Sequence, residues 1–274
     1  MRRHPLKALL LMAAPAALAG CATAEGPRFT AQHQSALDAA VAAPTRTPAN
    51  LVRDRHRNPA ATLAFFGVRP TDTVVEIWPG GGWYTEILAP YVLGGGGTLY
   101  AAAPDRGLNT VRRMMEANPA VYGNMRLANF PVREAGQTPV PAGTADAVLT
   151  FRNVHNWMMG QQPFAEDAFR QMYAMLKPGG VLGIEEHRLP ESADAARERT
   201  SGYVKVSTVR RLAEQAGFEY VGASEVNANP RDTADYPQGV WTLPPTLRLG
   251  DQDRARYQAI GESDRMTLLF RKPR

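Results

Sequence analysis

From about residue 51 onward, the hydrophobic positions of the chain alternate between two periods. Short runs rich in β-branched residues alternate with segments in which apolar residues recur every three or four positions. This pattern predicts an α/β fold with a doubly wound, mostly parallel, seven-stranded sheet, in which ligands bind at the carboxyl ends of the strands. The predicted strands are 73–78, 98–103, 124–130, 145–151, 181–187, 218–226 and 265–273, and the predicted helices are 83–93, 108–118, 163–176 and 208–217.

The first 21 residues follow a different pattern. Arg2, Arg3 and Lys7 precede an apolar stretch that ends at Leu18-Ala19-Gly20-Cys21, which is typical of an export signal. The stretch is shorter than the roughly 20 residues of a stable membrane span. A signal-anchor helix is the alternative, and the small residues of a cleavage site disfavour it.

The segment 18–21 resembles the lipobox of bacterial lipoproteins. The resemblance implies that residues 1–20 are a signal peptide and that Cys21 becomes the lipidated first residue, anchored to a membrane. With Ala22 after the cysteine, it implies a periplasmic protein at the outer membrane. Cys21 is the only cysteine, so intramolecular disulfides and multi-thiolate metal sites are excluded.

Composition divides the remaining chain into two parts. Residues 21–50 are rich in Ala, Thr and Pro and predict a tether with one short helix, and residues 51–274 suffice for one domain. The formal charge of the whole chain is +5, of which three positive charges lie in the signal segment. The basic runs at 53–57 and 271–274 are short, so we expect no nucleic-acid partner.

The segment VVEIWPGGGWYTEIL, residues 74–88, has the character of a ligand-binding turn. A predicted strand ends near Glu76, and Gly80, Gly81 and Gly82 precede a predicted helix. Glycines let a backbone approach a ligand closely, and the free N–H groups of a helix start face it. An acid at the strand end repels phosphate, so the turn favours a cationic or hydroxyl-bearing ligand.

Three segments together resemble class I S-adenosylmethionine-dependent methyltransferases: 74–88, ADAVLTFRNVHNW at 145–157 and MLKPGGVLGIEEHR at 175–188. Residues 51–274 are similar to a subgroup of predicted methyltransferases that carry export signals. The resemblance implies S-adenosyl-L-methionine as cofactor and a small-molecule methyl acceptor as partner. It places Glu76, Gly80 and Gly82 at the cofactor, with Gly81 between them.

The turn departs from the family pattern at Trp78, which occupies the position of the first glycine. Either the backbone turns differently there or the indole lines the pocket, where it could stack on an adenine-like ring; a ring that faces the core is the alternative. Pro79 removes one N–H donor from the turn.

The family's ribose-binding acid is also replaced, because Ala103 stands at its position. Asp105, 23 residues after Gly82, is the candidate substitute, with a surface turn acid as an equal alternative. Asn129, just beyond the third strand, matches the region that meets the adenine edge in the family.

Candidate catalytic residues follow the fourth and fifth strands. The resemblance places Asn153, His155 and Asn156 near the acceptor, with His155 as a base or orienting group and a structural role as the alternative. His187 is the next candidate. His155, Glu186 and His187 could converge as a metal site, but no local ligand pair supports one, so no metal is expected.

The predicted export of the chain raises a second hypothesis for its function. S-adenosylmethionine is made in the cytosol, so an exported chain could have lost catalysis and bind another small ligand or an envelope partner. Trp78, Pro79 and Ala103 favour this alternative. Glu76, the glycines and the intact segment 152–157 favour the enzyme, which is the preferred interpretation.

Overall fold

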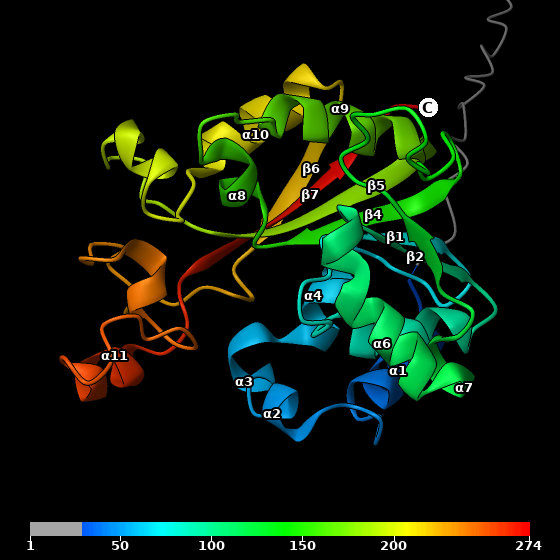
Figure 1. The fold of residues 1–274 in the computed structure, drawn as a ribbon, viewed down its shortest axis with the longest axis horizontal. Helices are drawn as coiled ribbons and strands as arrows, with labels where there is room; N and C mark the ends of the chain where they lie inside the picture. Colours follow the sequence, from blue (N-terminus) through cyan, green and yellow to red (C-terminus); the bar gives the residue numbers. More distant parts are fainter. Residues whose placement is uncertain (1–28) are drawn as a thin grey trace, which may run out of the picture.

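The structure, a computed structural model, describes residues 29–274. One sheet runs in the order β3-β2-β1-β4-β5-β7-β6, with β1 to β5 parallel and β7 antiparallel to both of its neighbours (Figure 1). This confirms the predicted seven-stranded, mostly parallel sheet. The strands are β1 (Thr73–Ile77), β2 (Thr98–Ala102), β3 (Arg126–Ala128), β4 (Ala145–Phe151), β5 (Leu176–His187), β6 (Glu219–Ser224) and β7 (Arg265–Arg271).

Helices cover both faces of the sheet because its central strands are apolar on both sides. Successive side chains point to opposite faces, so Val74 packs into one core cluster and Val75 into the other. One face is covered by α1 (Ala31–Val41), α4 (Pro59–Phe65), α5 (Thr85–Leu88), α6 (Asn109–Ala117) and α7 (Pro119–Tyr122). The other is covered by α8 (Val154–Met158), α9 (Ala165–Met175) and α10 (Val206–Gln215), as Figure 1 shows.

The predicted helix 83–93 is less regular than its spacing suggests. Its first α-helical turn is α5, and Ala89–Leu93 continues as a π-helix, η1. Pro90 lies in this stretch and has no N–H for an i→i−4 hydrogen bond, which favours a change of helix type at that point.

The described part of the segment predicted as a tether, residues 29–50, packs against the domain. The expected short helix is α1, whose first turn is capped by the Thr30 hydroxyl accepting from the His33 N–H. Leu37 on this helix is 0% exposed and belongs to the core. Two short helices follow, α2 (Pro48–Leu51) and α3 (Asp54–Arg57). Residues 29–50 are therefore part of the folded domain.

The predicted signal peptide 1–20, Cys21 and the first residues of the predicted tether lie outside the described residues. Within residues 29–274, no helix has both the length and the apolar character needed to cross a bilayer.

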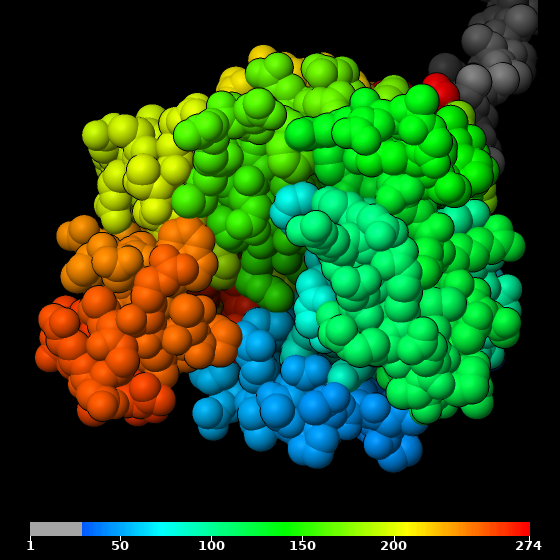
Figure 2. Space-filling view, viewed as in Figure 1, coloured from blue at the N-terminus to red at the C-terminus, as the bar shows by residue number. Residues whose placement is uncertain are grey.

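A second cover, which we call the cap, consists of residues 189–203 and 229–261. It contains η3 (Ala195–Arg199), η4 (Gly239–Thr242) and α11 (Arg254–Ile260). Its own small core includes Leu189, Tyr203 and Leu243. The cap (orange and yellow-green), the N-terminal helices (blue) and the segment after β4 (green) surround a hollow in the surface in Figure 2. Alternating hydrophobicity did not predict this element.

Substitution of Leu37 tests whether the N-terminal segment is part of the core. Leu37→Ala should lower the free energy of unfolding by about 2–5 kcal/mol, because it removes a fully buried side chain. Urea denaturation measures this loss. The matched control is Gln32→Ala, on an exposed position of the same helix, which should change stability by no more than about 0.5 kcal/mol. Equal stabilities of the two variants would contradict the packed arrangement.

Candidate functional site

The turn after β1 keeps a glycine-like backbone at Trp78. Its φ is 53°, in the left-handed region that costs a residue with a Cβ about 1–2 kcal/mol. The Trp78 N–H donates to the Ala102 carbonyl (2.9 Å), and the Asn153 amide donates to the Trp78 carbonyl (3.3 Å). Trp78 thus adopts a backbone conformation that ordinarily favours glycine.

The indole of Trp78 packs toward the core. Its Nε1–H donates to the Phe130 carbonyl (3.1 Å), and its ring makes an edge-to-face contact with Trp157 at 6.0 Å between centroids. Of the two orientations considered for this side chain, the structure has the core-facing one. The ring thereby joins the ends of β1 and β3 to α8.

The three glycines of the turn have different surroundings. Gly80 and Gly81 are exposed, and a Cβ on Gly81 would meet nothing within 4 Å. Gly82 has φ 81°, and a Cβ there would lie 2.7 Å from the Met114 sulfur. Gly80 and Gly81 therefore leave open space for a ligand, whereas Gly82 allows close packing against α6.

Glu76 lies at the carboxyl end of β1 and is only 2% exposed. Burial raises the pKa of this carboxyl to about 7, although the Thr85 hydroxyl donates to it (2.6 Å) and Arg152 lies nearby, both of which lower the pKa. Near neutral pH the group is partly protonated. A cationic ligand beside it would favour the ionised form.

Asp105 starts η2 (Asp105–Leu108) after β2, and Asn129 directly follows β3. Asp105, whose side chain is 76% exposed, pairs with Arg112 (2.5 Å). The Asn129 side-chain oxygen accepts from the Thr138 N–H (2.8 Å) and holds the loop after β3. Their assignment to ribose and adenine stays a prediction. Ala103, at the position of the family's acid, is buried.

Asn153 holds the turn in place. Its Nδ2 donates to the carbonyls of Ile77 (3.1 Å) and Trp78, and to the Thr150 hydroxyl (3.2 Å). The amide therefore ties the end of β4 to the turn after β1. Asn156, three residues further on, is exposed.

His155, Glu186 and His187 converge at the carboxyl ends of β4 and β5, as the neighbouring strands predict. The His155 Nδ1 lies 2.9 Å from a Glu186 oxygen, and the His155 N–H donates to the other oxygen (3.1 Å). The two imidazole rings are 5.3 Å apart. Among residues 29–274 this is the one group with donors placed for a metal ion, its three ligand atoms lying within 4.8 Å of one another.

His187 differs from His155 in its environment. Its Nδ1 lies 2.5 Å from the Ser263 hydroxyl. Burial lowers the pKa of His187 well below its ordinary value, and the nearby charges of Arg152 and Arg265 lower it further. This ring is neutral at pH 7.

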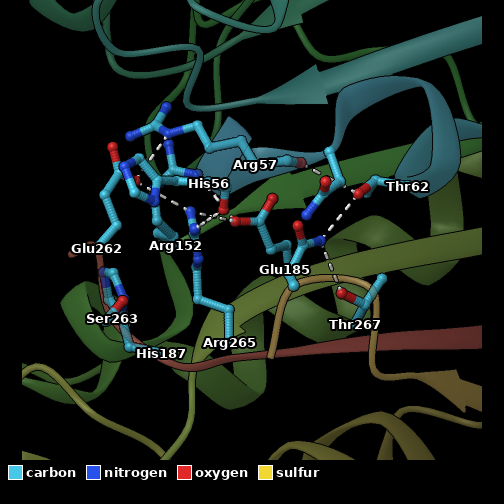
Figure 3. A network of polar contacts seen from close by, with 12 residues as sticks. His56, Arg57, Thr62, Arg152, Glu185, His187, Glu262, Ser263, Arg265 and Thr267 are labelled. Atoms are coloured by element: carbon cyan, nitrogen blue, oxygen red, sulfur yellow. Dashed lines mark hydrogen bonds and ion pairs between the residues drawn. The ribbon is translucent and has the colours of Figure 1, made fainter. Parts of the chain in front are cut away.

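Sequence reasoning missed a buried network beside these histidines, shown in Figure 3. Glu185, 0% exposed, accepts from Arg152 (3.1 Å), Arg265 (3.1 Å) and the Tyr84 hydroxyl (3.0 Å). Arg57 is buried and donates to Glu262 (3.0 Å). Only the acid Glu185 inside an apolar strand hinted at this network.

A comparison with known protein families gives one match, which includes the turn after β1. Residues 75–184 match the family described as methyltransferase domain. The match includes the turn after β1 and the residues from β4 into β5, and it ends before Glu185. The sheet order and the flanking helices are those of the class I, Rossmann-like methyltransferase fold. A comparison with curated proteins found no match.

Solved structures share the fold at low sequence identity. A SAM-dependent methyltransferase from Aquifex aeolicus is 20% identical, with a TM-score of 0.50, and covers 71% of this chain and 93% of its own. Phosphoethanolamine N-methyltransferase 2 from Haemonchus contortus, in complex with S-adenosyl-L-methionine, is 17% identical, with a TM-score of 0.51 over 80% and 53% of the two chains. The [4+2]-cyclase SpnF is 14% identical, with a TM-score of 0.57 over 88% and 92%.

The raised pKa of Glu76 predicts a pH-dependent stability. Between its ordinary value of 4.5 and about 7, the folded chain binds a proton that the unfolded chain releases. The resulting stabilisation is complete below pH 4.5 and is lost as the pH rises through 7. The unfolding free energy of Glu76→Gln minus that of wild type should therefore increase by about 2–3 kcal/mol when the pH is raised from 5 to 8. Urea denaturation at both pH values checks it, with the exposed Glu166→Gln as control for the lost charge.

Proposed function

We propose that the chain transfers a methyl group from S-adenosylmethionine to a small-molecule acceptor. The observation that carries the proposal is the turn after β1 within a methyltransferase domain: a buried acid, Glu76, lies beside the open backbone of Gly80 and Gly81. These features fit a ligand with a cationic amino-acid portion, because the carboxylate suits the cation and the bare backbone permits close approach.

The acceptor would lie beside His155, His187 and the cap. Bound S-adenosylmethionine supplies an electrophilic methyl group on its sulfonium sulfur. Glu186 accepts a hydrogen bond from the Nδ1–H of His155, which leaves Nε2 of a neutral ring free to take a proton from the acceptor. Asn153 keeps the turn and the end of β4 in register, so that donor and acceptor are aligned.

We further propose that the chain is exported and anchored as a lipoprotein through Cys21, most simply at the periplasmic face of the outer membrane. The support is the sequence pattern of Arg2, Arg3 and Lys7 followed by the lipobox-like segment 18–21. This pattern also underlies the assignment to a subgroup of exported methyltransferases.

Calorimetric titration of the purified full chain with S-adenosylmethionine tests the methyltransferase proposal. We expect micromolar binding, about −8 kcal/mol, and similar binding of S-adenosylhomocysteine. Because the ligand favours ionised Glu76, affinity should be greater at pH 8 than at pH 6.

Glu76→Gln should weaken this binding by about tenfold and remove its pH dependence, as expected for the loss of one charge-assisted hydrogen bond. Glu166→Gln, an exposed carboxylate on α9, is the matched control. No heat at millimolar ligand would instead support the alternative, a methyltransferase-like module that binds another ligand or an envelope partner.

Acyl labelling in a bacterial host tests the anchor. The wild-type chain should incorporate a labelled fatty acid and sediment with membranes. Cys21→Ala should do neither, because it removes the only thiol of the chain. Label that persists in this variant would contradict the proposed anchor.

A further inference from the structure

A buried cluster of charged side chains lies between the N-terminal helices and the carboxyl ends of β4 and β5 (Figure 3). We call it the arginine cluster. It brings together residues far apart in the sequence: Arg53 and Arg57 around α3, Arg152 after β4, Glu185 on β5, and Glu262 and Arg265 at the start of β7.

The arginine cluster contains more positive than negative charge. Glu262 accepts from Arg53 (2.7 Å), Arg57 (3.0 Å) and Arg265 (3.2 Å). Glu185 accepts from Arg265 and Arg152, both at 3.1 Å. Four guanidinium groups therefore share two carboxylates, an excess of two positive charges.

Neighbouring groups remove this excess only in part. Glu76 faces Arg152, but burial raises its pKa to about 7 and it is only partly ionised. Glu186 is engaged by His155 and by the His187 N–H (2.8 Å). His187 is neutral because burial lowers its pKa.

The excess charge lies where solvent compensates little. Arg265 is 1% exposed and Arg57 is 4% exposed. Burial and the charge of Arg152 lower the pKa of Arg57 to about 9, so the guanidinium stays charged at neutral pH. A buried charge without a matching counter-charge is unfavourable, so such a site favours an anionic ligand.

Two buried donor groups also have no acceptor. Arg53 Nη2 and Arg265 Nε make no hydrogen bond to any other residue in the part of the chain that the structure describes. Guanidinium groups bind planar oxyanions through two parallel hydrogen bonds, and a carboxylate or phosphate oxygen suits donors of this kind.

We propose that the arginine cluster binds a carboxylate or phosphate group of the methyl acceptor. The inference rests on the proposed methyl transfer. The cluster adjoins His187 through the neighbouring residues Glu262 and Ser263. The acceptor site also has aromatic neighbours, since the Trp241 ring of the cap lies 6.1 Å from the His155 ring.

A metal ion at His155, Glu186 and His187 is the competing use of the same edge. Both Glu186 oxygens already accept hydrogen bonds from the His155 and His187 residues. The excess of guanidinium groups nearby would oppose a divalent cation by charge repulsion. The positive charge at this edge of the sheet therefore favours an anionic ligand over a metal ion.

The cofactor carries a carboxylate of its own, so an experiment must separate it from the acceptor. Arg57 lies 4.8 Å from the Trp83 ring, next to the turn that faces the cofactor. Arg53, paired with Glu262 on the β7 side, is the better test position. Its side chain is partly exposed, so substitution there perturbs folding less than at Arg57.

The probes are benzoate and phenyl phosphate, which present the two oxyanions on one ring, with benzamide as the neutral analogue. Each is titrated at constant ionic strength into the full chain, free and saturated with S-adenosylhomocysteine. At least one anion should bind saturably to both forms, and benzamide should bind about tenfold more weakly or not at all.

Arg53→Gln should weaken anion binding by about tenfold while leaving the affinity for S-adenosylhomocysteine unchanged. Arg53→Lys, which keeps the charge but loses the planar fork, should be intermediate. Arg55→Gln is the matched control on the exposed side of α3, and anion binding should not change. Circular dichroism of each variant checks folding.

Two results would overturn the proposal. One is the absence of saturable binding by both anions. The other result has two parts: the anion competes with S-adenosylhomocysteine, and Arg53→Gln lowers the affinity for S-adenosylhomocysteine. If the variant keeps its affinity for 5′-methylthioadenosine, which lacks the carboxylate, the cluster binds the carboxylate of the cofactor instead. Failure of S-adenosylhomocysteine to bind counts against methyl transfer alone, since the free chain still reports on the anion.

Discussion

The carboxylate of Glu185 organises the carboxyl edge of the sheet. It is fully buried on β5, so it must be matched by charge and hydrogen bonds within the protein. Its partners come from three other places: Tyr84 beside α5, Arg152 after β4 and Arg265 on β7. Arg265 then extends the network to Glu262 and through it to the N-terminal helices. Glu185 thus connects the helix after the β1 turn, the segment after β4 and the N-terminal helices through one network of hydrogen bonds and ion pairs.

Backbone conformation at the turn after β1 depends on side chains from its neighbours. Trp78 is held in a left-handed conformation by an indole hydrogen bond to Phe130 and by the amide of Asn153. These contacts offset a cost of about 1–2 kcal/mol. The bulky ring packs beside the turn against Trp157 and leaves Gly80 and Gly81 open.

The periodicity of hydrophobic residues predicted the strands and the edge of the sheet at which the candidate site lies. The β-branched runs of β1 and β4 identified the strands, and the parallel sheet then placed His155 and His187 at one edge. The arginine cluster was not predictable from the sequence, because arginine is ordinarily a surface residue. Arg57 is buried here beside its partner Glu262, which lies 205 positions away in the sequence. The packing of Leu37 was missed for a related reason: an Ala-rich segment has a weak pattern, and its fit depends on a surface formed later in the chain. The cap likewise lacks strand or helix periodicity.

The two histidines at this edge have different capacities because their partners differ. His187 lies toward the guanidinium groups and contacts a hydroxyl, so a positive charge on its ring is unfavourable. His155 lies against Glu186, whose carboxylate can accept from its ring in either protonation state. A proton removed from an acceptor is thus better placed on His155, while His187 serves as a neutral neighbour. An anionic acceptor would strengthen this division, since its charge would sit at the arginine cluster and leave the reacting atom near the imidazole of His155.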